Sequence, residues 1–248
     1  MKRRRWACTL VFLILLAAGI CAEDFAGLFG KRYSESLASV ASEGPSWCAE
    51  LERLGADPYV LVPMVFPEVL KYSLLRDEVE TVSLAALSVT RGSDLADFSI
   101  GRFEMKPSFV ERIEITLASM EAPAEAFQAV IQFPPGSSEF VRRAIRLQRL
   151  RDIRWQLLYL ASFSFIVRGR FDLSGLDGAA LVRFLAAAYN RGFWLSREQI
   201  SAAADWKLFP RGAHGRPGPY RYADIAVDCF LRHWPDLYAR VIRPTASP

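Results

Sequence analysis

The sequence predicts a mainly α-helical protein with one folded domain. Apolar residues recur at helical spacing in several segments, and glycine, proline and helix-capping residues separate these segments. A chain of 248 residues with 52% hydrophobic and 23% charged residues is long and apolar enough to bury one well-formed core. Because no internal repeat, low-complexity tract or interdomain linker divides the chain, one helical domain with added helices is the expected architecture.

Residues 1–22 predict a signal peptide. Four basic residues, from Lys2 to Arg5, precede an apolar run over residues 7–20, and small residues follow up to Ala22. The apolar run is shorter than the roughly 20 residues that a membrane-spanning helix needs. We therefore expect export, with two alternative links to a membrane: an uncleaved signal, or a lipid attached to Cys21.

The charge balance argues against a nucleic-acid partner. The chain has 31 basic and 27 acidic residues, and the four basic residues near the N-terminus account for the whole excess. A mature chain without them is formally neutral and lacks the positive surplus that binds phosphates. Cys48 and Cys229 are the cysteines of the mature chain, and the sequence allows either a disulfide between them or two separate buried thiols.

The first part of the body predicts short amphipathic helices. One covers residues 34–41 and the next covers residues 46–54, with a Glu-Gly-Pro turn at residues 43–45 between them. We interpret residues 23–57 as an N-terminal helical extension that precedes a domain over residues 58–243.

An apolar helix follows and leads to a glutamate. Pro58 suits the first turn of this helix, whereas Pro63 and Pro67 predict a kink or a break just before Glu68. Residues 78–89 then have the apolar spacing of a half-buried helix.

The middle of the chain predicts two further helices. Pro107 begins one of them, and the proline-rich residues 133–137 mark a strong break. A helix of about 30 residues is expected from there to residue 167. The arginines of its first half are interpreted as a solvated face, and the apolar residues 157–167 are expected to cross the core.

The last third predicts an alanine-rich helix and a final amphipathic helix. Asp177 is a cap candidate for the first, which covers residues 178–191, and Gly192 follows its end. A Gly/Pro-rich loop at residues 212–219 separates it from the final helix at residues 222–234.

The residue inventory leaves acid–base chemistry by a carboxyl group as the main option. His214 and His233 are the only histidines and lie in no ligand-spaced cluster, so we expect no metal site and no cofactor. Glu68 follows an apolar segment, and apolar surroundings raise the pKa of a carboxyl until it can act as a general acid. The alternative is a glutamate that is exposed or paired with Lys71 or Arg76.

Three short segments of the chain follow one another in the order of a known set of sequence motifs. Residues 60–68 form the apolar stretch that ends in Glu68, residues 101–108 read Gly-Arg-Phe-Glu-Met-Lys-Pro-Ser, and residues 186–192 read Ala-Ala-Ala-Tyr-Asn-Arg-Gly. This order resembles the three motifs of the lysozyme-like lytic transglycosylases of the soluble murein type, bacterial enzymes that cut peptidoglycan between N-acetylmuramic acid and N-acetylglucosamine. The chain resembles a divergent member, and the resemblance implies a lysozyme-like fold in the periplasm or cell envelope.

The resemblance also implies a mechanism. Glu68 would protonate the leaving oxygen and then take the proton of the muramoyl 6-hydroxyl as a 1,6-anhydro ring closes, while the N-acetyl group of the substrate replaces a second carboxylate. Glu80 is an alternative acid. The implied partner is the glycan strand of peptidoglycan, and the residues expected to bind it are Ser99, Gly101, Phe103, Glu104, Met105, Tyr189 and Asn190.

Three positions depart from the motif pattern, and the first is Val69, which follows Glu68 where the family usually has serine. Arg102 stands where the family usually has an apolar residue, and Glu104 stands where it has glutamine. Either the two form a local ion pair, or Glu104 accepts a sugar hydroxyl in place of the glutamine. An alternative function follows from such changes: a non-catalytic protein that binds peptidoglycan or scaffolds an envelope complex.

Overall fold

The computed structural model describes residues 23–75, 98–121, 125–210 and 218–242, and this part of the chain is mainly helical, as the sequence predicts. The predicted signal peptide, the predicted helix at residues 78–89 and most of the predicted loop at residues 212–219 lie outside the described residues. The helices are α2 (Phe25–Phe29), α3 (Lys31–Arg53), α4 (Pro58–Leu75), α6 (Pro107–Ala118), the 3-10 helix η1 (Glu125–Phe127), α7 (Gln128–Ile131), α8 (Glu139–Arg151), α9 (Ile153–Arg170), α10 (Gly178–Arg191), α11 (Arg197–Ala203), α12 (Tyr222–Arg232) and α13 (Trp234–Val241).

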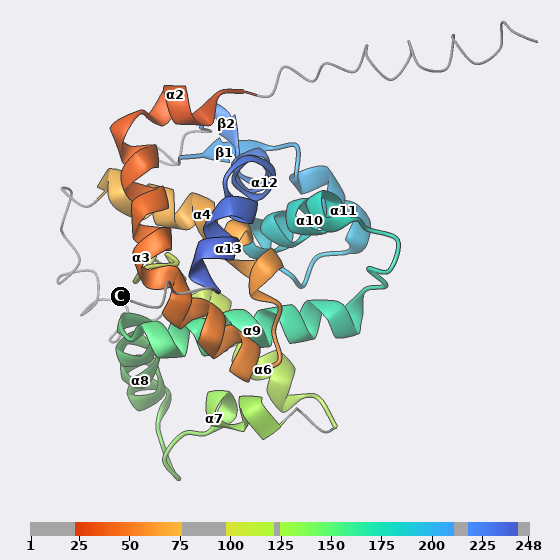
Figure 1. Ribbon diagram of the computed structural model, residues 1–248. Coiled ribbons are helices and arrows are strands. Elements are labelled where there is room, and N and C mark those ends of the chain that lie inside the picture. The colour runs from red at the N-terminus through yellow and green to blue at the C-terminus, as the bar shows by residue number, and fades with distance from the viewer. Residues whose placement is uncertain (1–22, 76–97, 122–124, 211–217, 243–248) are drawn as a thin grey trace, which may run out of the picture.

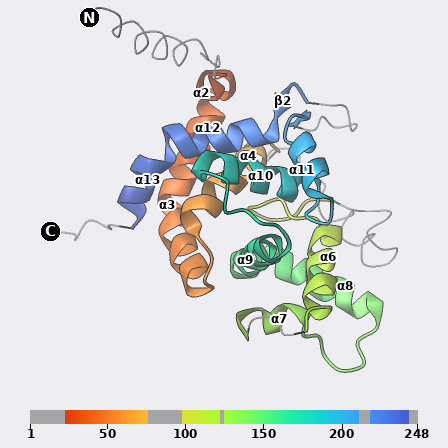
Figure 2. The ribbon, with the colours of Figure 1, turned by 90° about the vertical axis from the view of Figure 1, so that its right-hand side faces the viewer.

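The helices form two groups that α3 connects. In Figure 1, α4, α10, α12 and α13 lie in the upper half and α6 to α9 in the lower half, while α3 runs from one half to the other. The view in Figure 2 shows the same division. Helix α4 packs against α3, α10 and α12, and α3 also contacts α9. The predicted extension therefore shares the core with the rest of the chain, to which it contributes Tyr33, Trp47 and Leu51.

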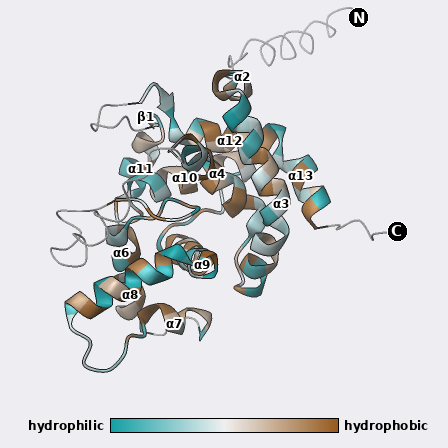
Figure 3. Ribbon diagram, turned by 90° about the vertical axis from the view of Figure 1, so that its left-hand side faces the viewer, coloured by the Kyte–Doolittle hydropathy of each residue, from teal (hydrophilic) through white to brown (hydrophobic). Residues whose placement is uncertain are grey.

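Helix α4 is continuous, so the predicted break before Glu68 is wrong. It runs from Pro58 to Leu75 with Pro63 and Pro67 inside it. Each internal proline removes a backbone hydrogen bond. The cost is offset because the helix is buried over most of its length, and Figure 3 shows its hydrophobic residues in the interior of the molecule. Glu68 consequently lies inside a rigid helix, about two turns before its end.

Helix α3 is also unbroken, which corrects the prediction of two short helices. Pro45 lies inside it, and Gly44 faces α13, where an added Cβ would come within 3.3 Å of the Val241 side chain. A close crossing of two helices explains the glycine better than a turn does. Packing of Trp47 and Cys48 in the core then holds the segment after the proline in helical form.

One longer predicted helix is divided in the structure, and the predicted final helix is present but ends two residues early. The helix expected up to residue 167 is split between α8 and α9 at Asp152, whose carboxylate accepts a hydrogen bond from the backbone N–H of Arg154 at 2.9 Å. The final helix ends at Arg232, and α13 begins at Trp234. Other predicted ends are confirmed: Pro107 begins α6, Asp177 caps α10, and Gly192 follows its last residue.

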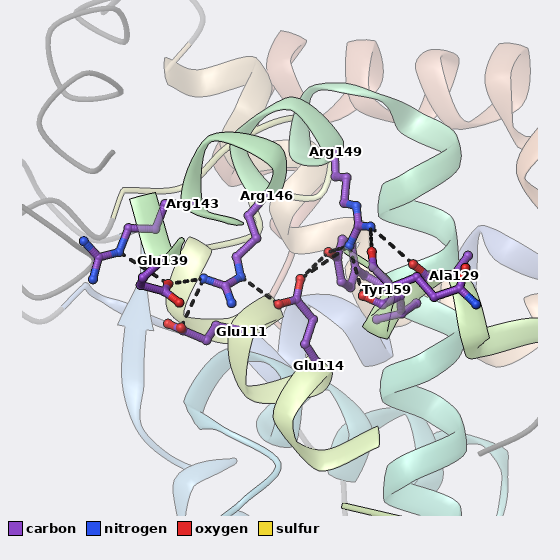
Figure 4. A network of polar contacts seen from close by, with 10 residues as sticks. Glu111, Glu114, Ala129, Glu139, Arg143, Arg146, Arg149 and Tyr159 are labelled. Atoms are coloured by element: carbon purple, nitrogen blue, oxygen red, sulfur yellow. Dashed lines mark hydrogen bonds and ion pairs between the residues drawn. The ribbon is translucent and has the colours of Figure 1, made fainter. Parts of the chain in front are cut away.

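The solvated face that the sequence predicts for the arginines of α8 is present only in part: Arg142 and Arg151 are exposed, whereas the prediction is wrong for two others. Arg146 and Arg149 are buried and belong to a polar network around Glu114 of α6 (Figure 4). Arg146 Nε donates to Glu114 Oε2 at 2.7 Å, and the Tyr159 hydroxyl donates to Glu114 Oε1 at 2.7 Å. Because these partners come from α6, α8 and α9, the network joins the three helices.

Small elements complete the fold. Strands β1 (Lys207–Phe209) and β2 (Tyr220–Arg221) form an antiparallel pair that the sequence does not predict. Cys48 and Cys229 are separate buried thiols. Within the described residues, no helix is both long enough and apolar enough to cross a membrane.

Candidate functional site

A cleft of about 250 Å³ brings together segments that are far apart in the sequence. Its walls come from α4, the turn after residue 98, the start of α6, the end of α10, β1 and the start of α12. The residues of the sequence-based site that line it are Glu68, Ser99, Glu104, Met105, Tyr189 and Asn190. Gly101 and Phe103 lie behind this wall, and Glu80 is outside the described residues.

Glu68 is a buried carboxyl on the cleft side of α4. The residue is 7% exposed, and its Oε2 atom has no hydrogen-bond partner among the described residues. Burial raises the pKa of Glu68 to about 7, although the positive charge of Lys71 opposes that rise. The interpretation of Glu68 as an exposed residue is therefore wrong, whereas the expected proximity to Lys71 is present, with Nζ 3.6 Å from Oε2.

The turn that faces Glu68 is a tight hairpin. Backbone hydrogen bonds of 2.9 and 3.0 Å join Ile100 and Met105 in both directions. Gly101 has a φ of 76°, and a Cβ there would lie 2.0 Å from Nε2 of Gln156. The same Gln156 accepts a hydrogen bond from the backbone N–H of Phe103 at 2.9 Å. Gly101 and Phe103 thus support the turn from behind, and only its other side contacts the cleft.

Arg102 and Glu104 point to different partners, so they form no local ion pair. The guanidinium of Arg102 contacts Glu43 and Ser39 of α3 and lies over the ring of Tyr72. Glu104 has a φ of 47°, in the left-handed region that a residue with a Cβ rarely occupies. Its Oε2 atom lies 3.0 Å from Nζ of Lys71. Arg102 therefore fixes the turn to α3, while Glu104 belongs to the cleft.

The end of α10 forms the opposite wall. The hydroxyl of Tyr189 donates a hydrogen bond to the backbone carbonyl of Phe103 at 2.8 Å, which ties α10 to the turn. The next residue, Asn190, lines the cleft. Trp194 is 39% exposed at the cleft edge and packs over Gly192, where an added Cβ would lie 2.5 Å from the indole ring. This glycine therefore allows a large aromatic face to stand beside the cleft.

Tyr222 is a cleft residue that the sequence analysis does not identify. It is the first residue of α12, is buried, and has a hydroxyl without a hydrogen-bond partner among the described residues. Burial raises the pKa of Tyr222, and the charge of Glu68 raises it further because the two groups are neighbours. An aromatic residue that opens an amphipathic helix reads as a core residue in the sequence, so no local signal marks it.

The site is defined by its geometry alone. Comparison of the chain with protein-family models, curated proteins and solved structures finds no match. In the described part of the chain, no cluster of three or more histidine, cysteine, aspartate or glutamate side chains could hold a metal ion. The cleft thus presents a carboxyl that can hold a proton near neutral pH. It lies beside the charged side chains of Lys71 and Glu104, and the hydroxyl, amide and aromatic groups around them suit a polar ligand with apolar faces.

Proposed function

We propose that the chain is an exported lytic transglycosylase that cuts peptidoglycan between N-acetylmuramic acid and N-acetylglucosamine. The observation that carries the proposal is the position of Glu68, a buried carboxyl with a pKa raised to about 7 in a cleft that the three motif segments share. A lysozyme-like arrangement of the helices and release into the periplasm or cell envelope are part of this proposal.

Glu68 acts as the single acid and base. It donates its proton to the glycosidic oxygen as the bond to C1 breaks, and it later accepts the proton of the 6-hydroxyl as that oxygen bonds to C1. A pKa near the working pH suits both steps, because the carboxyl must lose and regain one proton in each turnover. The substrate N-acetyl group stabilises the positive charge at C1 between the two steps.

The remaining cleft residues bind and orient. The hydroxyl of Tyr222 is close enough to Glu68 to hold its carboxyl in one rotamer once substrate excludes water. Asn190 offers an amide to a sugar hydroxyl or N-acetyl group, and Trp194 offers an aromatic face to a sugar ring. Tyr189 fixes the distance between α10 and the hairpin turn.

The test is muropeptide release from purified sacculi by the chain that begins at residue 23. We expect products with 1,6-anhydro ends, which mass spectrometry separates from hydrolysis products by the mass of one water. Glu68→Gln lowers release by about 100- to 10,000-fold. The matched control is Glu35→Gln on the exposed surface of α3, which keeps full activity.

A non-catalytic peptidoglycan-binding or scaffold protein is the second candidate, and one observation favours it: Glu104 and Lys71 occupy the part of the cleft that faces Glu68. Sedimentation with insoluble peptidoglycan measures binding apart from cleavage. If the wild type and Glu68→Gln are both folded, bind equally and release nothing, the scaffold function replaces the enzymatic one.

A further inference from the structure

Lys71 lies between two carboxyl groups of the cleft. It is one helical turn after Glu68 on α4, and its side chain is 19% exposed. Its Nζ atom is 3.0 Å from Glu104 Oε2, 3.6 Å from Glu68 Oε2 and 3.5 Å from Ser99 Oγ. The ammonium is therefore held from the hairpin side and keeps a fixed distance to Glu68.

The backbone of the turn is strained at the residue that holds Lys71. Glu104 is the non-glycine residue with positive φ in the described part of the chain, a conformation that is unfavourable for a residue with a Cβ. The surroundings enforce it: Ile100 and Met105 are paired on either side of the turn, and Phe103 is bonded at both its N–H and its carbonyl. The strain directs a carboxylate towards Lys71 instead of towards solvent.

We infer that Lys71 and Glu104 are a positioning pair, in which the Glu104 carboxylate holds the Lys71 ammonium beside Glu68 so that Glu68 can both give and take back its proton. The inference rests on the proposed function, since it assigns roles around the acid and base of that reaction. It also explains the glutamate in place of the glutamine of the motif, because an amide would hold an ammonium far less strongly.

The charges around Glu68 explain why a pair is needed. Burial alone favours the protonated carboxyl, which suits the acid step and hinders the base step. A lone cation would favour the carboxylate and hinder the acid step. Glu104 offsets part of the Lys71 charge and fixes its place, so neither form is strongly preferred.

Other groups face Glu68 from each neighbouring element. Lys106 approaches from the turn and lowers the pKa of Glu68. Tyr189 of α10 and Tyr222 of α12 are neutral, since burial raises the pKa of both hydroxyls well above the usual value. The tyrosines therefore add no charge, and the balance at Glu68 depends on Lys71, Glu104 and Lys106.

The test compares pH–rate profiles of muropeptide release for Lys71→Met, Glu104→Gln and the double variant. Activity falls at high pH as Glu68 loses its proton, and we call this falling part of the pH–rate profile its alkaline limb. Without the Lys71 cation the carboxylate is less stable, so this limb moves up by about one pH unit. Without the Glu104 anion the Lys71 cation acts unopposed, and the limb moves down by about one pH unit. The double variant lies close to the wild type.

The controls separate positioning from structure. Lys71→Arg keeps a cation at the site and retains the wild-type limb within about half a pH unit, because the charge is unchanged. Lys31→Met and Glu35→Gln remove the partners of an exposed ion pair on α3 and leave the profile unchanged. A uniform loss of rate at every pH, with the limb in place, overturns the inference and makes the pair structural.

A second measurement does not depend on activity. Glutamate labelled with ¹³C at the side-chain carboxyl reports the titration of Glu68 by NMR, and its signal is assigned by its loss in Glu68→Gln. Opposite displacements in Lys71→Met and Glu104→Gln support the pair even if no muropeptide is released, in which case only the proposed function fails. If Lys71→Met does not fold, a downward displacement in Glu104→Gln supports the inference, and an unmoved or raised titration overturns it.

Discussion

Glu68 in the cleft and Glu114 in the α6–α8–α9 network are both buried carboxyls beside cations, but their oxygen atoms differ in the hydrogen bonds that they accept. Both oxygens of Glu114 accept hydrogen bonds at 2.7 Å, one from Arg146 and one from Tyr159. Glu68 Oε2 accepts none from the described residues, and the ammonium of Lys71 lies 3.6 Å from it. A carboxyl that is fully bonded holds helices together, whereas one left open is available to a ligand.

The cations of the two regions differ in the same way. Arg149 lies between the rings of Trp155 and Phe133, 4.1 and 4.6 Å from their centroids, and donates to the carbonyls of Val130 and Gln132. Its planar guanidinium is fixed on every side. Lys71 is a compact ammonium held mainly by Glu104, so a change of charge nearby can alter its influence on Glu68.

The largest expected effect comes from breaking the structural carboxyl network. Arg146→Met leaves Glu114 buried with one of its strongest partners removed, so we expect the free energy of unfolding to fall by about 3 to 5 kcal/mol. Denaturation in urea, followed by circular dichroism, measures the loss.

The matched control is Arg143→Met on the same helix. Arg143 is more exposed and pairs with Glu139 at 3.5 Å, so its loss costs less than about 1 kcal/mol. Equal effects of the two substitutions would show that the buried network contributes no more than a surface ion pair.

The next largest effect is a loss of folding stability near neutral pH, which arises because the buried Glu68 carboxyl must ionise there. Its pKa is raised from 4.5 to about 7 in the fold, so the folded state binds the proton more tightly than the unfolded chain does. The associated stability is complete below about pH 4.5 and is lost as the pH rises through about 7. Glu68→Gln does not titrate, and we expect it to be more stable than the wild type at pH 8 by about 3 kcal/mol.

Unfolding curves at pH 4 and pH 8 test this expectation. The difference between Glu68→Gln and the wild type should be small at pH 4 and should grow between pH 4.5 and 7. A difference that is constant with pH would mean that Glu68 titrates normally in the fold.

The smallest effects distinguish two tyrosines of the cleft. Tyr189→Phe removes a buried hydrogen bond to the Phe103 carbonyl and is expected to lower the free energy of unfolding by about 1 to 2 kcal/mol.

Tyr222→Phe removes a hydroxyl that has no hydrogen-bond partner among the described residues, so stability should stay within about 0.5 kcal/mol. We expect its muropeptide release to fall about tenfold, as for one lost hydrogen bond to Glu68 in the reaction. A stability loss in Tyr222→Phe that matches Tyr189→Phe would assign both hydroxyls to the fold.

The sequence predicts the parts of the fold that depend on local rules. Pro107 at a helix start, Asp177 as a cap and Gly192 after a helix end are all confirmed, because caps and breakers act on their own neighbours. The same rules fail at Pro45, Pro63 and other internal positions, where the burial of a long helix outweighs the loss of single backbone hydrogen bonds.

The candidate site shows the same contrast, because some of its residues are indicated by the sequence and others only by the fold. The resemblance of three short segments to family motifs singles out Glu68, Glu104 and Tyr189, and only Glu68 is also indicated by its apolar neighbours in the sequence. From the sequence, Lys71 is expected only as an ion-pair partner of Glu68, and Tyr222 only as the first residue of the final helix.

What the sequence by itself determined is the helical class, several helix ends and Glu68 as a carboxyl that follows an apolar segment. Only the tertiary structure decided that Lys71 faces Glu104 and Glu68 together, that Tyr222 stands beside them, and that Arg146 and Arg149 are buried. The physical reason is that periodicity and capping describe interactions between residues a few positions apart. The charge and burial of a side chain depend instead on elements that meet only when α4, α10 and α12, or α6, α8 and α9, pack against one another.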